Sequence, residues 1–480
     1  MPLHSTRPHN HADDPAALLS IRPQFASADI GKVPRDRLPD GEMDASTAYQ
    51  IVHDELMLDG NARLNLATFV TTWMDEHARR LMAECADKNM IDKDEYPQTA
   101  ELERRCVTML ARLWHAPETG AAVGCSTTGS SEACMLAGMA LLRHWRARRD
   151  AGGMPAGRPN LVMGANVQVC WDKFCRYWDV EPRLVPCSAE STHLTPDGAV
   201  AHCDEQTIGV VAVLGSTFDG SYEPVANIAA ALDRLNVERG LDVPVHVDAA
   251  SGGFIAPFLD PDLEWDFRLR RVQSINASGH KYGLVYPGVG WALWRDQAAL
   301  PDDLVFHVEY LGGDMPTFAL NFSRPGAQVV AQYYTMLRLG FEGYRRVQQS
   351  CRDTARWLAD AVARLAPFEL LTDGSELPVF AFRRIARLSR ARIGDRGRRA
   401  GDGRGDWTVY DVADALRMRG WLVPAYPMPP ALDDVSVLRV VVRNGFGPDL
   451  ASLLAADLRR AVASLDRGRG VGESRPSFHH

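Results

Sequence analysis

Apolar positions along the chain follow two spacings, one typical of helices and one typical of buried strands. Helical spacing covers residues 48–58, 67–82 and 133–145. Short apolar runs bounded by turn residues predict strands. These strands are expected at residues 160–163, 208–215, 243–247, 272–277 and 289–294. Because strands and helices alternate, we predict an α/β fold with a mostly parallel sheet, helices on both faces, and a ligand at the carboxyl ends of the strands.

The C-terminal third of the chain predicts a smaller α+β unit. Helices are expected over residues 343–365 and 410–419, and strands over 379–382 and 437–442. The first 40 residues are rich in Pro, His, Asp and Arg and favour an arm rather than a domain. The predicted parts are therefore an N-terminal arm (1–60), a large domain (61–345), a small domain (346–465) and a tail (466–480).

Composition and charge narrow the class of protein. The 480 residues are 46 % hydrophobic and 24 % charged, which is typical of a globular protein and excludes a disordered chain. A net charge of −8 excludes a global basic surface for nucleic acid or anionic lipid. Segment 383–406, with nine Arg, three Asp and five Gly, predicts a solvated loop. No apolar run approaches the ~20 residues that span a bilayer, so we expect no integral membrane contact.

The cysteines indicate a reducing compartment. The chain has nine of them, an odd number, and none forms a Cys-x-x-Cys pair. Cys170 and Cys175 come closest to a pair, but no second pair lies nearby to complete four metal ligands. We therefore expect reduced thiols, a cytoplasmic location and no metal site.

Two residues that follow predicted strands point to the chemistry. Asp248 follows the strand at 243–247, and Lys281 follows the strand at 272–277. A lysine amine can bond covalently to the aldehyde of pyridoxal 5′-phosphate (PLP), and an aspartate can keep the pyridine nitrogen of PLP protonated. Ser130 and Ser131 precede a predicted helix, whose free backbone amides suit a phosphate dianion. Each motif alone also fits an ordinary helix cap or surface turn; their order along an α/β chain favours a PLP enzyme.

Longer strings of residues resemble a known family. Residues 129–133, 248–253 and 278–281 resemble the group II PLP-dependent decarboxylases of fold type I. The resemblance narrows to the bacterial glutamate decarboxylases through residues 58–63, 65–69, 91–93, 265–269, 310–313 and 321–325. It implies a large domain with a mostly parallel seven-stranded sheet, a smaller C-terminal α+β domain and PLP as the cofactor.

The resemblance also implies roles for residues around PLP. Lys281 would be the covalent anchor, Asp248 the partner of the ring nitrogen, and Thr217 a neighbour of the phenolic oxygen. Gln168 and Ala250 would lie against the two faces of the ring. The phosphate side is implied to involve Ser130, Ser131, Ser278 and His280, with Ser323 reaching in from a second subunit. An obligate homodimer follows from that last role.

For the substrate, the resemblance implies L-glutamate, converted to 4-aminobutanoate and CO₂ with consumption of one proton. Arg439 would bind the α-carboxylate through its planar guanidinium. Thr68 and the backbone of Phe69 would bind the distal carboxylate together with Asn89 and Asp92 of the partner subunit. Holding two acids close together is costly unless one is protonated or well hydrogen-bonded, which is one physical reason to expect an acidic working range.

The resemblance carries further expectations for two residues, Tyr310 and His480. Tyr310 matches a loop that reaches across the dimer, and it or Lys281 is expected to protonate Cα; we also count His280 among the catalytic residues. His480 matches a C-terminal histidine that closes the site at neutral pH, since only neutral imidazole is nucleophilic. A frayed terminus or the remnant of a purification tag explains the same tail equally well.

Some alternatives stay open on the sequence. The same fold decarboxylates other amino acids, such as aspartate or an aromatic one, and a catalytically silent PLP-binding scaffold would keep many of the same motifs. Segment 383–406 has no aromatic residue for stacking RNA bases. The N-terminal arm differs from that of hexameric relatives, which leaves a hexamer in doubt, and the tail lacks a calmodulin-binding helix.

Overall fold

The computed structural model describes residues 36–118, 122–154, 157–188, 190–308, 315–385 and 407–468. The chain divides into two compact units, Met1–Asn61 and Ala62–His480. The described part of the first unit contains helix α1 (Ala45–Leu56), which begins where the Asp44 carboxylate accepts a hydrogen bond from the backbone amide of Thr47. This confirms the helix predicted at 48–58, with its start three residues earlier.

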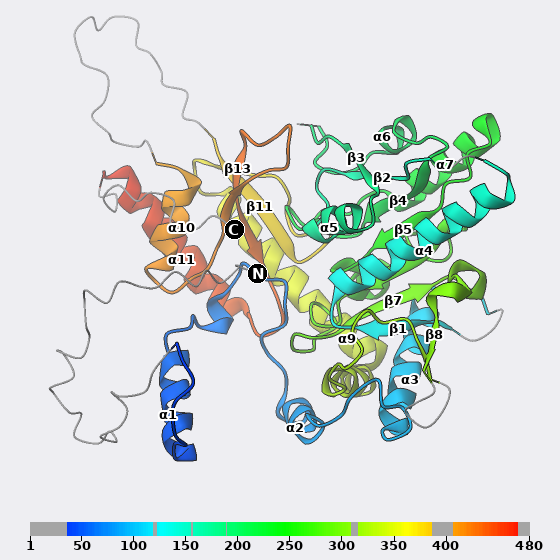
Figure 1. Cartoon of the computed structure of the whole chain (residues 1–480). Helices are drawn as coiled ribbons and strands as arrows, with labels where there is room; N and C mark the ends of the chain where they lie inside the picture. The colour runs from blue at the N-terminus through cyan, green and yellow to red at the C-terminus, as the bar shows by residue number, and fades with distance from the viewer. Residues whose placement is uncertain are drawn as a thin grey trace, which may run out of the picture. The chain divides into compact units, whose positions relative to one another are not determined.

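The second unit is built on a seven-stranded sheet in the order β1-β7-β6-β5-β4-β2-β3 (Figure 1). Its strands are β1 (Val123–Thr127), β2 (Asn160–Gly164), β3 (Glu181–Val185), β4 (Thr207–Val213), β5 (Val245–Asp248), β6 (Val272–Ala277) and β7 (Gly290–Trp294). β7 runs antiparallel to both neighbours, whereas the pairs from β6 to β3 are parallel. The predicted α/β fold with a mostly parallel sheet is confirmed.

Helices cover both faces of this sheet, because its strands are buried on both sides. Along β4, Val211 and Val213 pack with α4 and α5, whereas Val210 and Ala212 face the opposite layer, which contains α3 and α7. The helices that accompany the sheet are α2 (Glu76–Glu84), α3 (Pro97–Leu113), α4 (Ser130–Ala151), α5 (Val169–Tyr177), α6 (Pro196–Ala201), α7 (Val225–Arg239) and α8 (Ala256–Leu259). A two-stranded ribbon, β8 (Phe306–Val308) with β9 (Met315–Thr317), is also present.

One predicted helix is wrong over half its length. The helical spacing at 67–82 predicts a single helix, but α2 starts only after Asp75, whose carboxylate caps it by accepting from Ala78 N at 3.0 Å. The residues from 67 to 75 are irregular rather than helical, because distant side chains donate hydrogen bonds to their backbone carbonyls. Arg439 donates to the carbonyl oxygen of Ala67, and Arg443 donates to that of Val70.

The C-terminal elements are α9 (Ala327–Ala363), β10 (Phe368–Leu370), β11 (Val379–Arg384), α10 (Val409–Arg417), β12 (Ala425–Pro427), β13 (Ser436–Val441) and α11 (Pro448–Asp466). In this part, both predicted strands and the helix predicted at 410–419 are present, the helix predicted at 343–365 begins earlier, at Ala327, and β10, β12 and α11 were not predicted. The strands form an antiparallel sheet in the order β10-β11-β13-β12, and their apolar residues form a separate core cluster with α10 and α11. Helix α9 runs across the predicted boundary at 345/346 and bends at Gly340, whose φ is 56°. The domain boundary therefore stays a prediction.

Within the described ranges, no helix combines the length and apolar character needed to pass through a bilayer. The predicted arm, Tyr310, His480 and most of segment 383–406 lie outside the described residues wholly or in large part.

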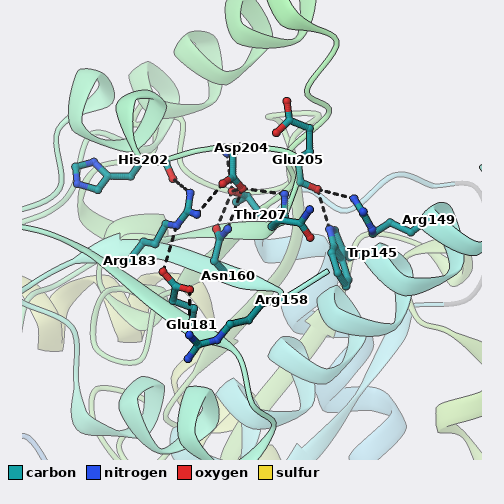
Figure 2. A network of polar contacts seen from close by, with 11 residues as sticks. Trp145, Arg149, Arg158, Asn160, Glu181, Arg183, His202, Asp204, Glu205 and Thr207 are labelled. Atoms are coloured by element: carbon teal, nitrogen blue, oxygen red, sulfur yellow. Dashed lines mark hydrogen bonds and ion pairs between the residues drawn. The ribbon is translucent and has the colours of Figure 1, made fainter. Parts of the chain in front are cut away.

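A polar network fastens the amino ends of β2, β3 and β4, at the edge of the sheet opposite the strand ends that bear Asp248 and Lys281 (Figure 2). The Asp204 carboxylate accepts from Asn160 Nδ2 at 2.9 Å, from Arg183 Nη2 at 2.6 Å and from Gln206 N at 2.8 Å. Thr207 Oγ1 donates to Asn160 Oδ1 at 2.8 Å. The network thus satisfies polar groups that three strands bury together.

We expect Asp204→Ala to lower the free energy of unfolding by about 1–2 kcal/mol, because it leaves the buried Asn160 amide and two partly buried donors without an acceptor. Urea unfolding measures this loss. The exposed Glu238→Ala on α7 serves as control, with a change within about 0.5 kcal/mol. An Asp204→Ala protein as stable as the control would show that the network does not stabilise the sheet.

Candidate active site

A cavity of about 260 Å³ lies at the carboxyl ends of β4, β5 and β6, beside the start of α4. Strand ends and a helix start meet there because parallel strands all finish at one edge of the sheet. The lining contains nine of the residues predicted for PLP: Ser130, Ser131, Gln168, Thr217, Asp248, Ala250, Ser278, His280 and Lys281.

Asp248 ends β5 and is buried, with N–H donors at both carboxylate oxygens. Trp171 Nε1 donates to Oδ2 at 2.9 Å, and Asn276 Nδ2 donates to Oδ1 at 3.0 Å. These charge-assisted hydrogen bonds stabilise the negative charge and fix the plane of the carboxylate. The Asp248 carboxylate therefore lines the cavity in a fixed orientation.

Lys281 follows β6 on a loop that a second segment holds in place. Thr71 donates from its hydroxyl to the carbonyl oxygen of Lys281 at 2.5 Å and from its amide to that of His280 at 2.7 Å. The lysine Nζ donates to Ser251 Oγ at 3.3 Å and lies 5.3 Å from the centre of the Phe69 ring. Burial lowers the pKa of Lys281, although the nearby Asp248 opposes this shift. A lower pKa increases the share of uncharged amine, which is the nucleophilic form.

The start of α4 faces the other end of the cavity. Ser130 is the first residue of α4, and its hydroxyl lies 2.7 Å from that of Ser278. Gly129 has a φ of +159°, and a Cβ there would stand 2.8 Å from His280 Cε1, so only glycine permits this approach. Burial, assisted by the charge of Lys281, lowers the pKa of His280 to about 4. Hydroxyls and free helix amides thus converge around space for an anion.

Behind Asp248 lies a second buried titratable residue, His246. His246 Nδ1 lies 2.8 Å from Ser274 Oγ, and His246 Nε2 lies 2.8 Å from Asn276 Oδ1. Burial lowers the pKa of His246 to about 4, against the opposing effect of Asp248. The imidazole is therefore neutral over the range in which the chain is expected to work.

The free energy of unfolding should depend on pH through His246. Because its pKa is about 4 in the folded chain and ~6.5 when unfolded, acid protonates the unfolded chain first. His246 stabilises the fold fully above pH ~6.5 and loses about 3 kcal/mol of stabilisation as the pH falls toward ~4. The free energy of unfolding of wild type minus that of His246→Phe should therefore be more positive at about pH 7 than at about pH 4.5. Equal differences at both pH values would contradict this.

Arg439 brings the small sheet to the cavity. It lies in β13 with 7 % of its surface exposed, and it donates to the carbonyl oxygens of Ala67 and Thr217. Its guanidinium carbon is 4.8 Å from the centre of the Phe69 ring. Phe69 therefore contacts both Arg439 and Lys281, and the structure brings these three predicted residues together. Thr68 is adjacent, and its hydroxyl accepts from the Val70 amide at 3.1 Å.

Asn89, Asp92 and Ser323 are grouped separately. Asn89 Nδ2 donates to Ser323 Oγ at 3.3 Å, and Asn89 Oδ1 accepts from the amide of Arg324. None of the three is among the described residues that line this chain's own cavity. The resemblance assigns these three residues to the site of a partner subunit, and that assignment stays a prediction.

Several residues that shape the site escape sequence reasoning. Trp171, Asn276, Thr71 and Ser251 hold Asp248 or Lys281 from other segments of the chain. Asn276 gives a weak signal, because a polar residue in a strand buried on both faces needs a hydrogen-bonding partner. The others give none that can be separated from ordinary core or turn positions.

Cys134, Cys170 and Asp248 place three atoms of metal-ligand type within 4.8 Å of one another. Burial raises the pKa of the Cys134 thiol well above its ordinary value, so the thiol is protonated. Cys134 Sγ donates to Asp248 Oδ2 at 3.6 Å, and the same oxygen accepts from Trp171. Cys134 therefore acts as a hydrogen-bond donor that helps to hold Asp248 in place.

The residues around the cavity fit PLP at three separate points. The hydroxyls and amides at the start of α4 fit its phosphate, the Lys281 amine fits its aldehyde, and the Asp248 carboxylate fits its pyridine nitrogen. These three groups come from separate segments of the chain and line one cavity. An ordinary helix cap or surface turn would not explain why they converge there.

Comparison with known proteins agrees with this geometry. The pyridoxal-dependent decarboxylase conserved domain matches residues 39–385. The chain is 54 % identical to a glutamate decarboxylase of Aliivibrio fischeri, covering 91 % of each chain, and 46 % identical to glutamate decarboxylase beta of Listeria monocytogenes, covering 93 % and 94 %. It superposes on the structure of a Lactobacillus brevis glutamate decarboxylase with a TM-score of 0.86 at 47 % identity, covering 92 % of this chain and 97 % of that one. The chain therefore belongs to the pyridoxal-dependent decarboxylase family and, within it, to the glutamate decarboxylases.

Proposed function

We propose that the protein decarboxylates L-glutamate to 4-aminobutanoate and CO₂, with PLP bound in the cavity and one proton consumed per turnover. The observation that carries the proposal is the convergence of Lys281, Asp248 and the start of α4 on one cavity beside the buried Arg439. Relatives at 46–54 % identity carry the name glutamate decarboxylase, which supports glutamate as the substrate.

The chain's residues divide the work at the reacting end of the substrate. When bound, PLP supplies an electron sink for the pair released as the bond from Cα to the carboxylate breaks. Lys281 anchors the cofactor through an amine whose pKa burial lowers. Asp248 would keep a proton on the ring nitrogen, because its carboxylate is oriented by the hydrogen bonds that it accepts from Trp171 and Asn276. Ser130, Ser278 and the first amides of α4 hold the phosphate.

Residues of the small sheet and of the irregular segment at 67–75 bind the substrate in this proposal. Arg439 binds the α-carboxylate in place of the two carbonyl oxygens it now contacts, since a carboxylate is the stronger acceptor. Phe69 covers Arg439 and Lys281 and keeps water from both. Thr68 binds the distal carboxylate together with the partner subunit's Asn89 and Asp92. An acidic working range follows, because protonation relieves the crowding of carboxylates.

The dimer completes each site in this proposal. Ser323, hydrogen-bonded to Asn89 in this chain, reaches the phosphate in the partner's cavity, and Tyr310 crosses between subunits to stand near Cα, where it or Lys281 donates the proton. His480 closes the site at neutral pH. A cytoplasmic location is supported by the nine cysteines, all of which are free thiols.

The test is product formation by the purified protein loaded with PLP. Glutamate, aspartate and an aromatic amino acid are supplied in parallel at about pH 4.5 and about pH 7, and amine products are separated by chromatography. We expect 4-aminobutanoate from glutamate, faster in acid, with little amine from the others. Preferential turnover of another amino acid would replace the substrate, and no turnover of any would favour the silent scaffold.

A further inference from the structure

Four buried polar side chains form a compact group on one face of β5 and β6. His246 pairs with Ser274 and Asp248 pairs with Asn276 in the parallel register, so all four point to the same face. Each is at most 4 % exposed. Trp171 covers the group, with its ring centre 5.2 Å from that of His246. Such a cluster is costly in a core unless every donor and acceptor in it is satisfied.

The chemistry of the groups fixes the direction of their hydrogen bonds. The Asp248 carboxylate only accepts, so Asn276 must present its Nδ2 to it and turn its Oδ1 toward His246. His246 Nε2 must then carry the proton that Oδ1 accepts. Neutral imidazole has only one N–H, so Nδ1 accepts from the hydroxyl of Ser274. Every hydrogen bond in the row therefore donates toward Asp248.

We propose that His246 is a positioning residue for the reaction: it fixes the amide of Asn276 and, through it, the charge and orientation of Asp248 toward the cofactor's ring nitrogen. This inference rests on the proposed function and adds a residue that does not touch the substrate. The titratable groups that face the row are Asp248 on β5, Cys134 on α4 and Cys170 on α5, and Lys281 lies across the cavity.

A merely structural role predicts something different. If His246 only fills space, an aromatic ring of similar size should serve as well, and any defect should follow lost stability. If it positions Asn276, the loss of its N–H should alter the cofactor's environment even in a protein that stays folded. The Asn276 amide would then be free to rotate and bring its oxygen against the carboxylate, where it repels.

The test compares His246→Phe, which keeps a ring but has no donor, with His246→Gln, which restores an N–H. His202→Phe is the matched control, because His202 lies at the end of α6 and its Nδ1 contacts the Gly198 carbonyl oxygen. Three quantities are measured on each full-length protein. They are the dissociation constant of PLP by equilibrium dialysis, the pH midpoint of the visible absorbance of the bound cofactor, and kcat and KM for glutamate.

We expect His246→Phe to weaken PLP binding about 10- to 100-fold, because it breaks the row of hydrogen bonds that ends on the Asp248 carboxylate. It should also move the pH midpoint of the absorbance and lower kcat more than it raises KM. His246→Gln should recover most of each change, and His202→Phe should match wild type. A folded His246→Phe protein with wild-type PLP affinity and absorbance midpoint would overturn the proposal.

Ser274→Ala keeps the test decisive if His246→Phe does not fold. Removing the donor at the far end of the row should weaken PLP binding about threefold. The variant should unfold at a lower urea concentration than wild type, because the buried Nδ1 of His246 loses its donor, but it should stay folded without urea. An unchanged PLP affinity in Ser274→Ala would count against the row. Failure of the proposed function looks different, because wild type itself would then show no PLP band or no turnover of glutamate.

Discussion

Lys281→Ala should lower the formation of 4-aminobutanoate by ~10³-fold or more, as the loss of a covalent catalytic group does elsewhere. The variant loses the only amine placed to bond the cofactor among the described residues lining the cavity. Its visible absorbance from the bond between cofactor and lysine should disappear, and borohydride should label nothing at position 281. Chromatography of the product and absorbance spectroscopy measure the two effects.

Stability offers an internal control for this variant. Burial lowers the pKa of Lys281 because the folded chain disfavours its charge, so without PLP the Lys281→Ala protein should unfold in urea no earlier than PLP-free wild type. Lys173→Ala, at an exposed position on α5, should keep full activity. Residual turnover close to wild type in Lys281→Ala would remove the covalent anchor from the mechanism.

Arg439→Lys should lower kcat/KM for glutamate by ~10²-fold or more, chiefly through a higher KM. Lysine keeps the positive charge but cannot offer two parallel N–H groups to a carboxylate, and it stacks less well on an aromatic face. The affinity for PLP should stay near that of wild type, because Arg439 does not line the cofactor cavity. Steady-state kinetics and equilibrium dialysis separate these two outcomes.

Arg383→Lys is the matched control for this substitution. Arg383 lies on the neighbouring strand β11, is exposed and pairs with Glu369 at 2.7 Å. A salt bridge of this kind contributes little, so its replacement should leave kcat/KM unchanged. If Arg439→Lys also left kcat/KM for glutamate unchanged, another residue would have to bind the α-carboxylate.

The fold could be predicted from sequence where burial imposes a long apolar run. β6 occupies the six residues predicted for it, because both of its faces are covered. β1 escaped prediction since its residues, Val123–Thr127, are mostly small or polar and pair with β7, which lies far along the chain. β3 escaped because it pairs only with β2 in the seven-stranded sheet, and its half-buried and exposed positions alternate around a proline, with only Val185 buried.

The helical spacing at 67–82 failed for a different reason. Its first half has carbonyl groups that arginines more than 370 residues away use as acceptors, namely Arg439 and Arg443. Local spacing carries no information about partners so distant. Tertiary hydrogen bonds replaced helical ones, and only the part after the Asp75 cap stayed helical.

The site shows the same division between local and distant information. Asp248 and Lys281 were predictable because polar residues at strand ends meet at one edge of a parallel sheet. The groups that hold them were not, because the contact of Asn276 with Asp248 depends on the register between β5 and β6. Glutamate as the substrate came from resemblance, because the geometry of one chain does not include the partner's residues.

The irregular segment around residues 65–72 contacts both the small sheet and the loop that carries Lys281. At one end Arg439 holds the carbonyl of Ala67, and at the other Thr71 holds the carbonyls of His280 and Lys281. The backbone between Ala67 and Thr71 thus limits how far the strand that bears Arg439 and the loop that bears Lys281 can separate. Such a limit suits an amine and a carboxylate that are carried on a single carbon. In β-amino acids one more bond separates these two groups, so we expect β-amino acids not to react.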